Sequence, residues 1–561
     1  MPLHIRSVLI PLLFLATLGA PVAAQANAPT KPGVMPTRLT LGGPPPRVRT
    51  EGELAAFLDE LEAQELMVYE ADGLEAYYQW KGETRHFAGP FARLAADLVS
   101  RRDYAAVIDR WRGKVKDSTL ARRLELHHRD FLVSRVNPAL SIALVDLQTA
   151  IQDTVEQLRF TVNGARLTRT ALSALVDTSA DRSLREAAYR ALPQVSAHTR
   201  APIVRALGLL DRIGRQEGFA NGAEAGLNNS SLEPVQVMHD LEAFEQATRP
   251  GYLAILDRVK QDLAINRVEP WDIDYWLHRQ EAAAGDRAWP KDSGLARLHD
   301  LMHAMGFAVD SLPIDIKVWD VPTGGITFPI RPPLEARLLT NPFPGSQFYE
   351  TLFHEYGHAL NFTLMRHDLP AAFFRGDETP LGEGLAETLG HFAYDHHWLA
   401  RAGGVSTADA ARLEAVGKMQ LLLWLRRTIA LNASAEITHY LHPAEDLDSL
   451  YAATYRRYVG VELPAGDYFA TRDMFATGPL YFQSYLYANM IAAQLREAMR
   501  AQFGVEDLTR EPRVAKWLTE KFFAQGAAVP WPEKIRQATG HPLSTDALVR
   551  YLAAAAPTTV Q

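Results

Sequence analysis

The apolar positions of this chain recur with the period of an α-helix over most of its length. Clear stripes fall at residues 54–61 and 140–151, and after residue 345 the same period runs to near Ala555. Thr50 and Glu53 have the spacing of a capping box, in which each side chain binds the backbone N–H of the other residue, so the first helix should begin there. The pattern therefore predicts a mainly helical protein.

One stretch, from Pro313 to Thr340, departs from the helical period. Residues 314–319 alternate between polar and apolar, and residues 324–328 and 336–339 also have the composition of extended chain. The prolines in this stretch exclude a long helix, because proline lacks a backbone donor and clashes with the preceding turn. We therefore expect one small β-sheet between two long helical regions.

The first 50 residues do not have the pattern of a folded domain. Arg6 precedes a short apolar run at residues 8–18, and small residues follow at Ala24 and Ala26, which is the order of a secretory signal peptide. A membrane anchor needs about 20 apolar residues, and this run is shorter. The sequence predicts a signal peptide over residues 1–26, a Pro/Gly-rich linker over residues 27–50, and no stable membrane anchor.

Charge and cysteine content narrow the classes of protein further. The formal net charge of −8 argues against nucleic acid as a partner, because there is no basic excess to displace counterions from phosphates. The 561 residues include no cysteine, which excludes disulfides, thiolate metal ligands and a cysteine nucleophile. Together with the predicted signal peptide, this composition indicates a periplasmic or secreted protein.

The pattern His-Glu-x-x-His occupies residues 354–358. Residues four apart lie on one face of a helix, so His354 and His358 can turn a ring nitrogen to the same zinc ion. Glu355 points to the side, where its carboxylate can take a proton from a water molecule that the zinc activates. With 18 histidines in the chain, roughly 0.03 chance matches are expected, so we predict one catalytic zinc ion per chain.

A catalytic zinc ion usually has three protein ligands and one open position. Thr379 and Pro380 predict the start of another helix, with a hydroxyl cap and proline at the first helical position. Glu383 and Glu387 lie on one face of that helix, and their small and apolar neighbours disfavour the alternative that both simply face solvent. We expect Glu383 to be the third ligand and Glu387 to accept the second ring N–H of a zinc-bound histidine.

The segment 351–360, Thr-Leu-Phe-His-Glu-Tyr-Gly-His-Ala-Leu, resembles the active-site helix of the thimet oligopeptidase and oligoendopeptidase F family of zinc peptidases. The spacing from His354 to Glu383 matches that family, and the related angiotensin-converting enzyme family has the same two-helix layout. The resemblance covers roughly residues 230–555. Further similarity lies in Pro270-Trp271-Asp272, in His367-Asp368-Leu369-Pro370 and in Gly324-Gly325.

The resemblance implies a two-lobed helical ellipsoid whose deep central channel admits short peptides and excludes folded proteins. We expect residues 51–561 to form one such domain, with a helical lobe over about 51–310 and a catalytic lobe over about 311–555. The small sheet then lies beside the zinc site, and Gly324, Gly325 and Tyr481 are the expected substrate-binding residues. The expected oligomeric state is a monomer.

In these families a tyrosine near the C-terminus, helped by a histidine, donates to the carbonyl oxygen that becomes charged in the transition state. The similar segment here makes Tyr485 the expected donor, with Tyr481 as the substitute. The alternative is that both tyrosines belong to an aromatic core stripe, because they lie four residues apart. The supporting histidine is missing, since its position falls on Phe475 or Asp473. His439 and His442 lie upstream on another predicted helix, and nothing in the sequence places either of them in the site.

The sequence leaves several functions open. The converting enzyme's anchors for a free substrate carboxylate fall on Asp473 and Phe482, which disfavours a peptidyl-dipeptidase and favours cleavage within short peptides. The missing histidine is consistent with a catalytically inactive peptide-binding relative, but the intact Glu355 argues against it. A zinc amidohydrolase of non-peptide substrates has no positive support. The prediction is a zinc-dependent oligopeptidase.

Overall fold

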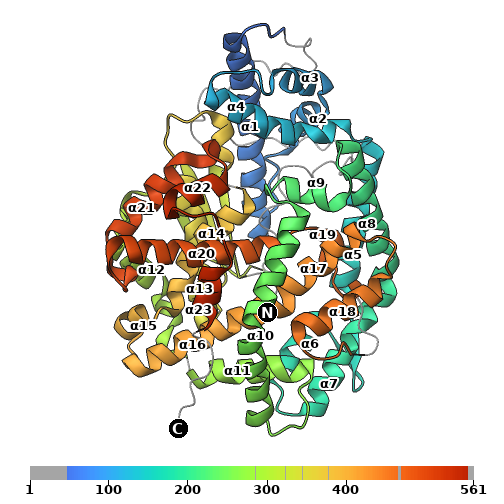
Figure 1. Ribbon diagram of the computed structural model, residues 1–561, viewed down its shortest axis with the longest axis vertical. Helices are drawn as coiled ribbons and strands as arrows, with labels where there is room; N and C mark the ends of the chain where they lie inside the picture. Colours follow the sequence, from blue (N-terminus) through green and yellow to red (C-terminus); the bar gives the residue numbers. More distant parts are fainter. Residues whose placement is uncertain are drawn as a thin grey trace.

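A computed structural model describes residues 47–284, 286–321, 324–343, 345–376, 378–464 and 469–553. The predicted signal peptide and residues 27–46 of the predicted linker lie outside these ranges. The described chain is mainly helical with two small sheets, which confirms the predicted fold class (Figure 1). Helices gather on two sides of the molecule, with α10 (Pro234–Asp262) between them.

The four N-terminal helices form a cap at one end of the molecule (Figure 1). The cap consists of the beginning of α1 (Glu51–Trp80) with α2 (Ala92–Ser100), α3 (Arg102–Trp111) and α4 (Ser118–Phe131), whereas the end of α1 runs toward the middle of the molecule and packs against residues 326–330. The predicted capping box is present, because Thr50 Oγ1 accepts the N–H of Glu53 while the Glu53 carboxylate accepts the N–H of Thr50. The cap buries its own apolar cluster, separate from the main core, which includes Leu58, Leu94, Ile108 and Leu124.

The helices on one side of Figure 1 come from two separate parts of the chain. The first part contributes α5 (Pro138–Gln157), α6 (Arg169–Thr178), α7 (Arg182–Ala191), α8 (Ser196–Glu217), α9 (Gly222–Asn228) and α11 (Pro270–Ala284). The second contributes α17 (Leu431–Leu441), α18 (Leu447–Val459) and α19 (Met474–Thr477). Because α19 packs on α5 and α8, and α17 on α9, the chain returns to this side after residue 310. A division into two lobes near that residue stays a prediction.

A short hairpin, β1 (Phe160–Val162) and β2 (Ala165–Leu167), was not predicted from the helical period. Its turn is Asn163-Gly164, and both residues have positive φ, at 48° and 82°. An Asn-Gly pair is the preferred sequence for a two-residue hairpin turn of this hand. The dipeptide was thus a usable signal, but strands of three residues are too short to show a period of two.

The predicted sheet is present beside the helix that carries the histidine pair. It contains β3 (Ile314–Val318), β4 (Gly325–Arg331) and β5 (Glu335–Thr340), in the order β3-β5-β4. β3 runs parallel to β5, whereas β4 is antiparallel to β5 and pairs Thr327 with Leu338. β4 and β5 both pack on α13 (Ser346–Thr363), so the sheet supports the helix with the His-Glu-x-x-His pattern.

The helices on the other side of Figure 1 surround α13. They are α12 (Gly294–Ala304), α14 (Thr379–Gly390), α15 (His396–Ala402), α16 (Thr407–Trp424), α20 (Phe482–Phe503), α21 (Arg513–Lys521), α22 (Trp531–Thr539) and α23 (Asp546–Ala553). α14 packs extensively on both α13 and α20 and is the central element of this group. One main hydrophobic core continues from this group into the helices of the opposite side.

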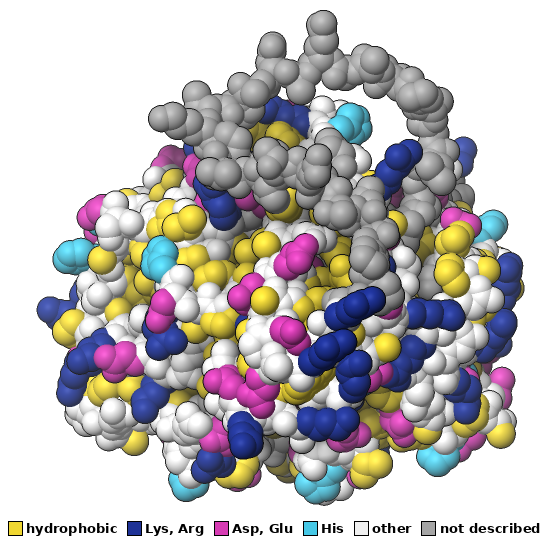
Figure 2. Space-filling model, turned by 90° about the horizontal axis from the view of Figure 1, so that it is seen from above, with side chains coloured by type: hydrophobic (Ala, Val, Ile, Leu, Met, Phe, Trp, Pro, Cys, Tyr) yellow, Lys and Arg dark blue, Asp and Glu magenta, His cyan; other side chains and the backbone are white. Residues whose placement is uncertain are grey.

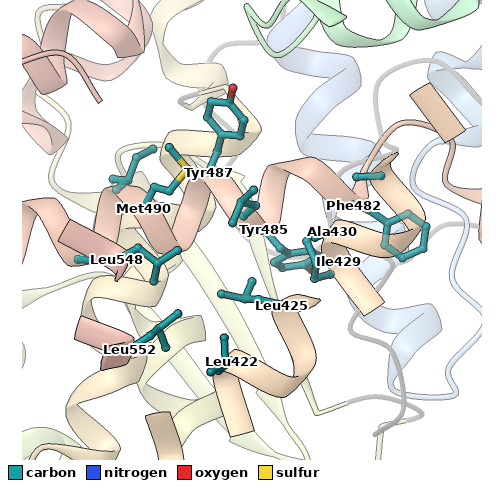
Figure 3. Packing of buried hydrophobic residues seen from close by; sticks show 14 of the residues in the cluster. Leu422, Leu425, Ile429, Ala430, Phe482, Tyr485, Tyr487, Met490, Leu548 and Leu552 are labelled. Carbon is teal, nitrogen blue, oxygen red and sulfur yellow. The ribbon is translucent and has the colours of Figure 1, made fainter. Parts of the chain in front are cut away.

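A π-helical segment, Leu425–Ala430, joins α16 to α17 without a break in the helix. Figure 3 shows this segment against α20, with Tyr485 near Ile429 and Ala430 in the main core. Such segments are rare and often occur at functional sites. Here the segment lies where the two groups of helices meet.

The surface carries charges of both signs. On the face seen in Figure 2, acidic and basic side chains are interspersed among apolar ones, with basic groups near its centre. Among the described residues, none of the helices has the length and apolar character that crossing a bilayer requires.

Candidate metal centre

His354 and His358 lie on one face of α13, as their spacing predicts. Their Nε2 atoms are 3.2 Å apart, and the two rings are nearly perpendicular at 82°. The opposite face of α13 is packed in the main core through residues such as Leu352, Phe353 and Leu360. This apolar face fixes the rotation of the helix and directs both imidazoles to one point.

Glu383 brings a carboxylate to the same point from α14. Its Oε2 lies 3.4 Å from the Nε2 of His354 and 3.7 Å from the Nε2 of His358. Three donors bound about 2.1 Å from a tetrahedral zinc ion are about 3.4 Å apart, so the three observed separations fit one ion. The two nitrogens and one carboxylate oxygen are also a ligand set that zinc prefers.

The electrostatics of the three groups also favour a cation. Burial disfavours a charge on His354, but Glu383 and Glu387 outweigh it and raise the pKa of this histidine to about 10. Burial likewise disfavours a charge on Glu383, but His354 and His358 outweigh it and hold the pKa of this carboxyl far below its usual range. The buried carboxylates thus strongly stabilise positive charge between the rings.

Another helix closely approaches α13 at Gly357. A Cβ atom at Gly357 would lie 2.7 Å from the Cα of Ala386 on α14. On the far side of α14, a Cβ at Gly384 would lie 2.7 Å from the Cγ2 of Ile491 on α20. Glycine at these positions lets α13 approach the backbone of α14 and lets the side chain of Ile491 lie against α14, which places Glu383 over the histidines.

Gly357→Ala should therefore destabilise the protein, although alanine favours helix by about 1 kcal/mol. The added methyl group would have to push α14 away, at a cost of about 1–3 kcal/mol typical of overpacking. It would also move Glu383 away from the histidines. Thermal unfolding and zinc titration should both show a loss, and unchanged values in both would contradict the packing described here.

Glu355 is buried beside the histidines and contacts β4. The Oγ1 of Thr327 lies 2.9 Å from Glu355 Oε2 and 2.8 Å from its backbone oxygen. A Cβ at Gly325 would lie 2.8 Å from Glu355 Cγ, so glycine is required for the strand to come this close. Gly324, the other predicted glycine, accepts the N–H of Asn341 at 2.7 Å.

Glu387 lies behind His354, at a separation longer than the hydrogen bond that the sequence predicts. Its Oε1 is 3.8 Å from the Nδ1 of His354, the ring nitrogen that points away from the cluster. Its other oxygen, Oε2, is 3.2 Å from the Nε2 of His391. His391 was not predicted to belong to the site, although its position four residues after Glu387 on the same helical path was a usable signal.

Both predicted tyrosines reach the site from the start of α20. The hydroxyl of Tyr481 donates to Glu383 Oε1 at 2.9 Å, so this residue contacts the predicted metal ligand directly. The ring of Tyr485 packs edge-on against Tyr481 and against Trp424, with centroids 5.4 and 5.3 Å away. Burial, then the charge of Glu383, raises the pKa of both hydroxyls, so both remain protonated donors.

The two positions that correspond to the supporting histidine of the resembled families hold other residues, and their side chains make other contacts. Phe475 packs in the core against Phe469 and Phe482, and Asp473 forms an ion pair with Arg169 at 2.8 Å. Both side chains are thus engaged in other contacts.

The start of α14 differs from the prediction. The helix begins at Thr379, but its N-cap is Glu378, and no side chain caps it. The expected hydroxyl cap by Thr379 is therefore wrong. The Glu378 carboxylate instead pairs with Arg129 at 2.9 Å and Arg122 at 3.3 Å. Both arginines lie on α4, so this N-terminal helix fixes the beginning of α14, which carries Glu383.

A second acidic cluster with a histidine lies between the cap and the 3-10 helix Ala371–Arg375. It contains Glu65, His127 and Asp130. Arg375 pairs with both carboxylates, and Glu62 binds His127 Nε2 at 3.0 Å. Burial disfavours a charge on His127, but Glu65 and Glu62 raise its pKa to about 9. Cationic groups already balance these carboxylates, so the cluster is an ionic link within the protein.

A comparison with protein families finds one relationship in sequence. Residues 437–556 match the model of the carboxypeptidase Taq (M32) metallopeptidase family. This segment contains Tyr481 and Tyr485 but not His354, His358 or Glu383. No curated protein matches the chain in sequence.

Several solved structures share the fold over nearly the whole chain. The M32 carboxypeptidase from Deinococcus radiodurans R1 is 15% identical with a TM-score of 0.61, over 89% of this chain and 98% of that chain. The carboxypeptidase from Pyrococcus furiosus is 13% identical with a TM-score of 0.60, over 90% and 99%. Trypanosoma cruzi metallocarboxypeptidase 1 is 15% identical with a TM-score of 0.60, also over 90% and 99%.

These findings correct the family named from the sequence. The predicted resemblance was to the thimet oligopeptidase and angiotensin-converting enzyme families, whereas the matching model is that of carboxypeptidase Taq. The helical fold is confirmed, and the matching model is that of a metallopeptidase family, the class that the resemblance implied. The matched residues 437–556 do not include the motif around His354, on which the resemblance rested.

Proposed function

We propose that this protein is a zinc-dependent carboxypeptidase that removes residues from the C-terminus of short peptides. The observation that carries the proposal is the triangle formed by His354 Nε2, His358 Nε2 and Glu383 Oε2, with Glu355 next to it. The match of residues 437–556 supports the finer assignment to a carboxypeptidase. The names of the structural neighbours support it as well.

The side chains around the triangle have separable roles in this reaction. Zinc bound there would polarise the scissile carbonyl and lower the pKa of water from about 15.7 to about 7. Glu355 accepts a proton from the attacking water and later returns it to the leaving amine. Thr327 holds the Glu355 carboxylate against β4. The hydroxyls of Tyr481 and Tyr485 are the donors available to the carbonyl oxygen as it becomes charged.

Cleavage within peptides, the expectation from the sequence, is the second candidate. It rested on the absence of two anchors for a free carboxylate, and Asp473 and Phe482 are indeed engaged elsewhere. Those anchors belong to a different family from the one now matched, so their absence no longer argues against a carboxypeptidase. We therefore favour removal of C-terminal residues.

Mass spectrometry of the products from one peptide library, prepared with free and with amidated C-termini, tests this proposal. A carboxypeptidase should shorten the free peptides by single residues and leave the amidated ones intact. Cleavage of both sets at internal bonds would establish an oligopeptidase, and loss of dipeptides would establish a peptidyl-dipeptidase. No products with a zinc-loaded protein would indicate an inactive peptide-binding relative.

The same experiment tests the cofactor. We propose one zinc ion per chain, so a chelator should abolish product formation and added zinc should restore it. Metal analysis of the reconstituted protein should give one zinc per chain, and a protein that binds no divalent ion would contradict the proposal. Export to the periplasm or the medium is also part of the proposal, and the signal-peptide pattern of residues 1–26 supports it. A monomeric state and short peptide partners complete the proposal.

Tyr485→Phe should lower kcat by about 10²–10³-fold with little change in KM, because the lost donor acts on an oxygen that is charged only in the transition state. Zinc affinity should be unchanged. Tyr481→Phe should instead weaken zinc binding, because it removes the hydrogen bond to Glu383 Oε1. Steady-state kinetics and zinc titration of both variants separate the two roles.

The opposite pattern would assign the roles differently. If Tyr481→Phe loses rate at full zinc occupancy while Tyr485→Phe keeps it, Tyr481 is the donor to the substrate oxygen. Tyr485 would then belong to the aromatic core with Trp424.

A further inference from the structure

The end of α14 places a second histidine behind the metal site. His391 is the first residue of the 3-10 helix His391–Tyr394 that follows α14 directly, and it is buried. Each oxygen of Glu387 faces a different imidazole, with Oε1 3.8 Å from His354 Nδ1 and Oε2 3.2 Å from His391 Nε2. The carboxylate thus lies between a predicted metal ligand and a second histidine.

The chemistry of the two groups determines which of them is the donor in the contact between Glu387 and His391. A carboxylate only accepts, so a hydrogen bond across this 3.2 Å contact requires the hydrogen on the Nε2 of His391. The remaining ring nitrogen, Nδ1, is buried without a hydrogen-bond partner. The contact with Glu387 is therefore the polar interaction that orients this ring.

An aromatic side chain of the C-terminal helix fixes the same ring from its face. His391 stacks on Tyr551 of α23, with centroids 5.8 Å apart and planes within 10°. The Arg496 guanidinium of α20 lies 4.5 Å from the centre of the Tyr551 ring. The backbone before His391 is also held, because a Cβ at Gly390 would lie 3.2 Å from the Cβ of His354.

We propose that His391 is a positioning residue of the metal centre, which holds Glu387 in the orientation that directs His354 toward the ion. The inference rests on the proposed zinc site and extends it by one residue. A carboxylate tethered on one oxygen loses less conformational freedom when its other oxygen binds the histidine. Removing the contact between His391 and Glu387 should weaken metal binding although all three metal ligands remain.

Two substitutions separate the polar contact of His391 with Glu387 from its stacking on Tyr551. His391→Phe keeps a ring to stack on Tyr551 but loses the donor, whereas His391→Gln keeps a donor at the reach of Nε2 but loses the ring. We expect His391→Phe to lower zinc affinity by about 10–100-fold, as for partners of metal-bound histidines. His391→Gln should stay within a few fold of wild type. His439→Phe, at another partly buried histidine away from the site, should have no effect.

Zinc affinity is measured by competition with a chromophoric chelator, using the full-length protein and the metal alone. In a Glu387→Gln background, His391→Phe should cause no further loss, because its effect acts through Glu387. Thermal unfolding of the metal-free variants shows whether the fold is equally stable in each. Wild-type affinity in His391→Phe, or an undiminished effect in the Glu387→Gln background, would overturn the inference. A wild-type protein that binds no zinc would instead overturn the proposed function, and this inference with it.

Discussion

Glu355→Gln should lose nearly all turnover while keeping its metal and its fold. The amide has the shape of the carboxylate but cannot accept a proton from the attacking water, and a general base typically contributes about 10²–10⁴-fold. Thr327 can still donate to the amide oxygen, so the buried side chain keeps its place against β4. Peptide hydrolysis under single-turnover conditions measures the loss.

The controls for this variant are direct. Zinc content and the thermal midpoint should equal those of wild type, because Glu355 is not one of the three groups that form the triangle. A variant that keeps a large part of its turnover would show that another group removes the proton. A variant that loses its metal would show that Glu355 has been assigned the wrong role.

Glu383→Ala should lose zinc binding almost completely, which is the largest expected effect on metal affinity. The substitution removes one of three ligands and also leaves the hydroxyl of Tyr481 without its acceptor. Glu387→Ala should lose less, about 10–100-fold, because this carboxylate acts through His354. Chelator competition measures both variants, and neither should turn over peptide at limiting zinc.

The order of these two effects is the informative result. If Glu387→Ala strips the metal while Glu383→Ala retains it, the two carboxylates have exchanged roles. The measured separations make that outcome hard to reconcile with the fold, because Glu383 Oε2 lies within 3.7 Å of both ring nitrogens.

The parts of the site that follow local periodicity could be predicted from the sequence. His354 and His358 must share a face on any helix, and the spacing to Glu383 suits a second helix packed on the first. Gly357 in a helix interior is a further local signal of a close neighbour, because glycine there costs stability unless packing requires it. The capping box of α1 and the three strands near residues 314–340 have equally local signals.

Contacts between distant segments could not be predicted in the same way. Arg129 and Glu378 are 249 residues apart, and nothing in either local pattern indicates that they pair. The hydrogen bond between Tyr481 and Glu383 joins residues 98 apart and gives Tyr481 a contact with a metal ligand that the sequence did not predict. Such pairs depend on how helices cross, and periodicity alone does not fix a crossing.

The close packing of α14 between α13 and α20 should also limit how fast the site exchanges its ion. Packed interiors have almost no free volume, so α14 cannot slide away from α13 by small steps while Gly357 lies against Ala386. Release then requires α14 to detach as a unit, a local opening with its own free energy. The amide hydrogens of α14 should therefore exchange slowly with solvent. A tightly held ion should leave at the rate of that opening, however strong the competing chelator.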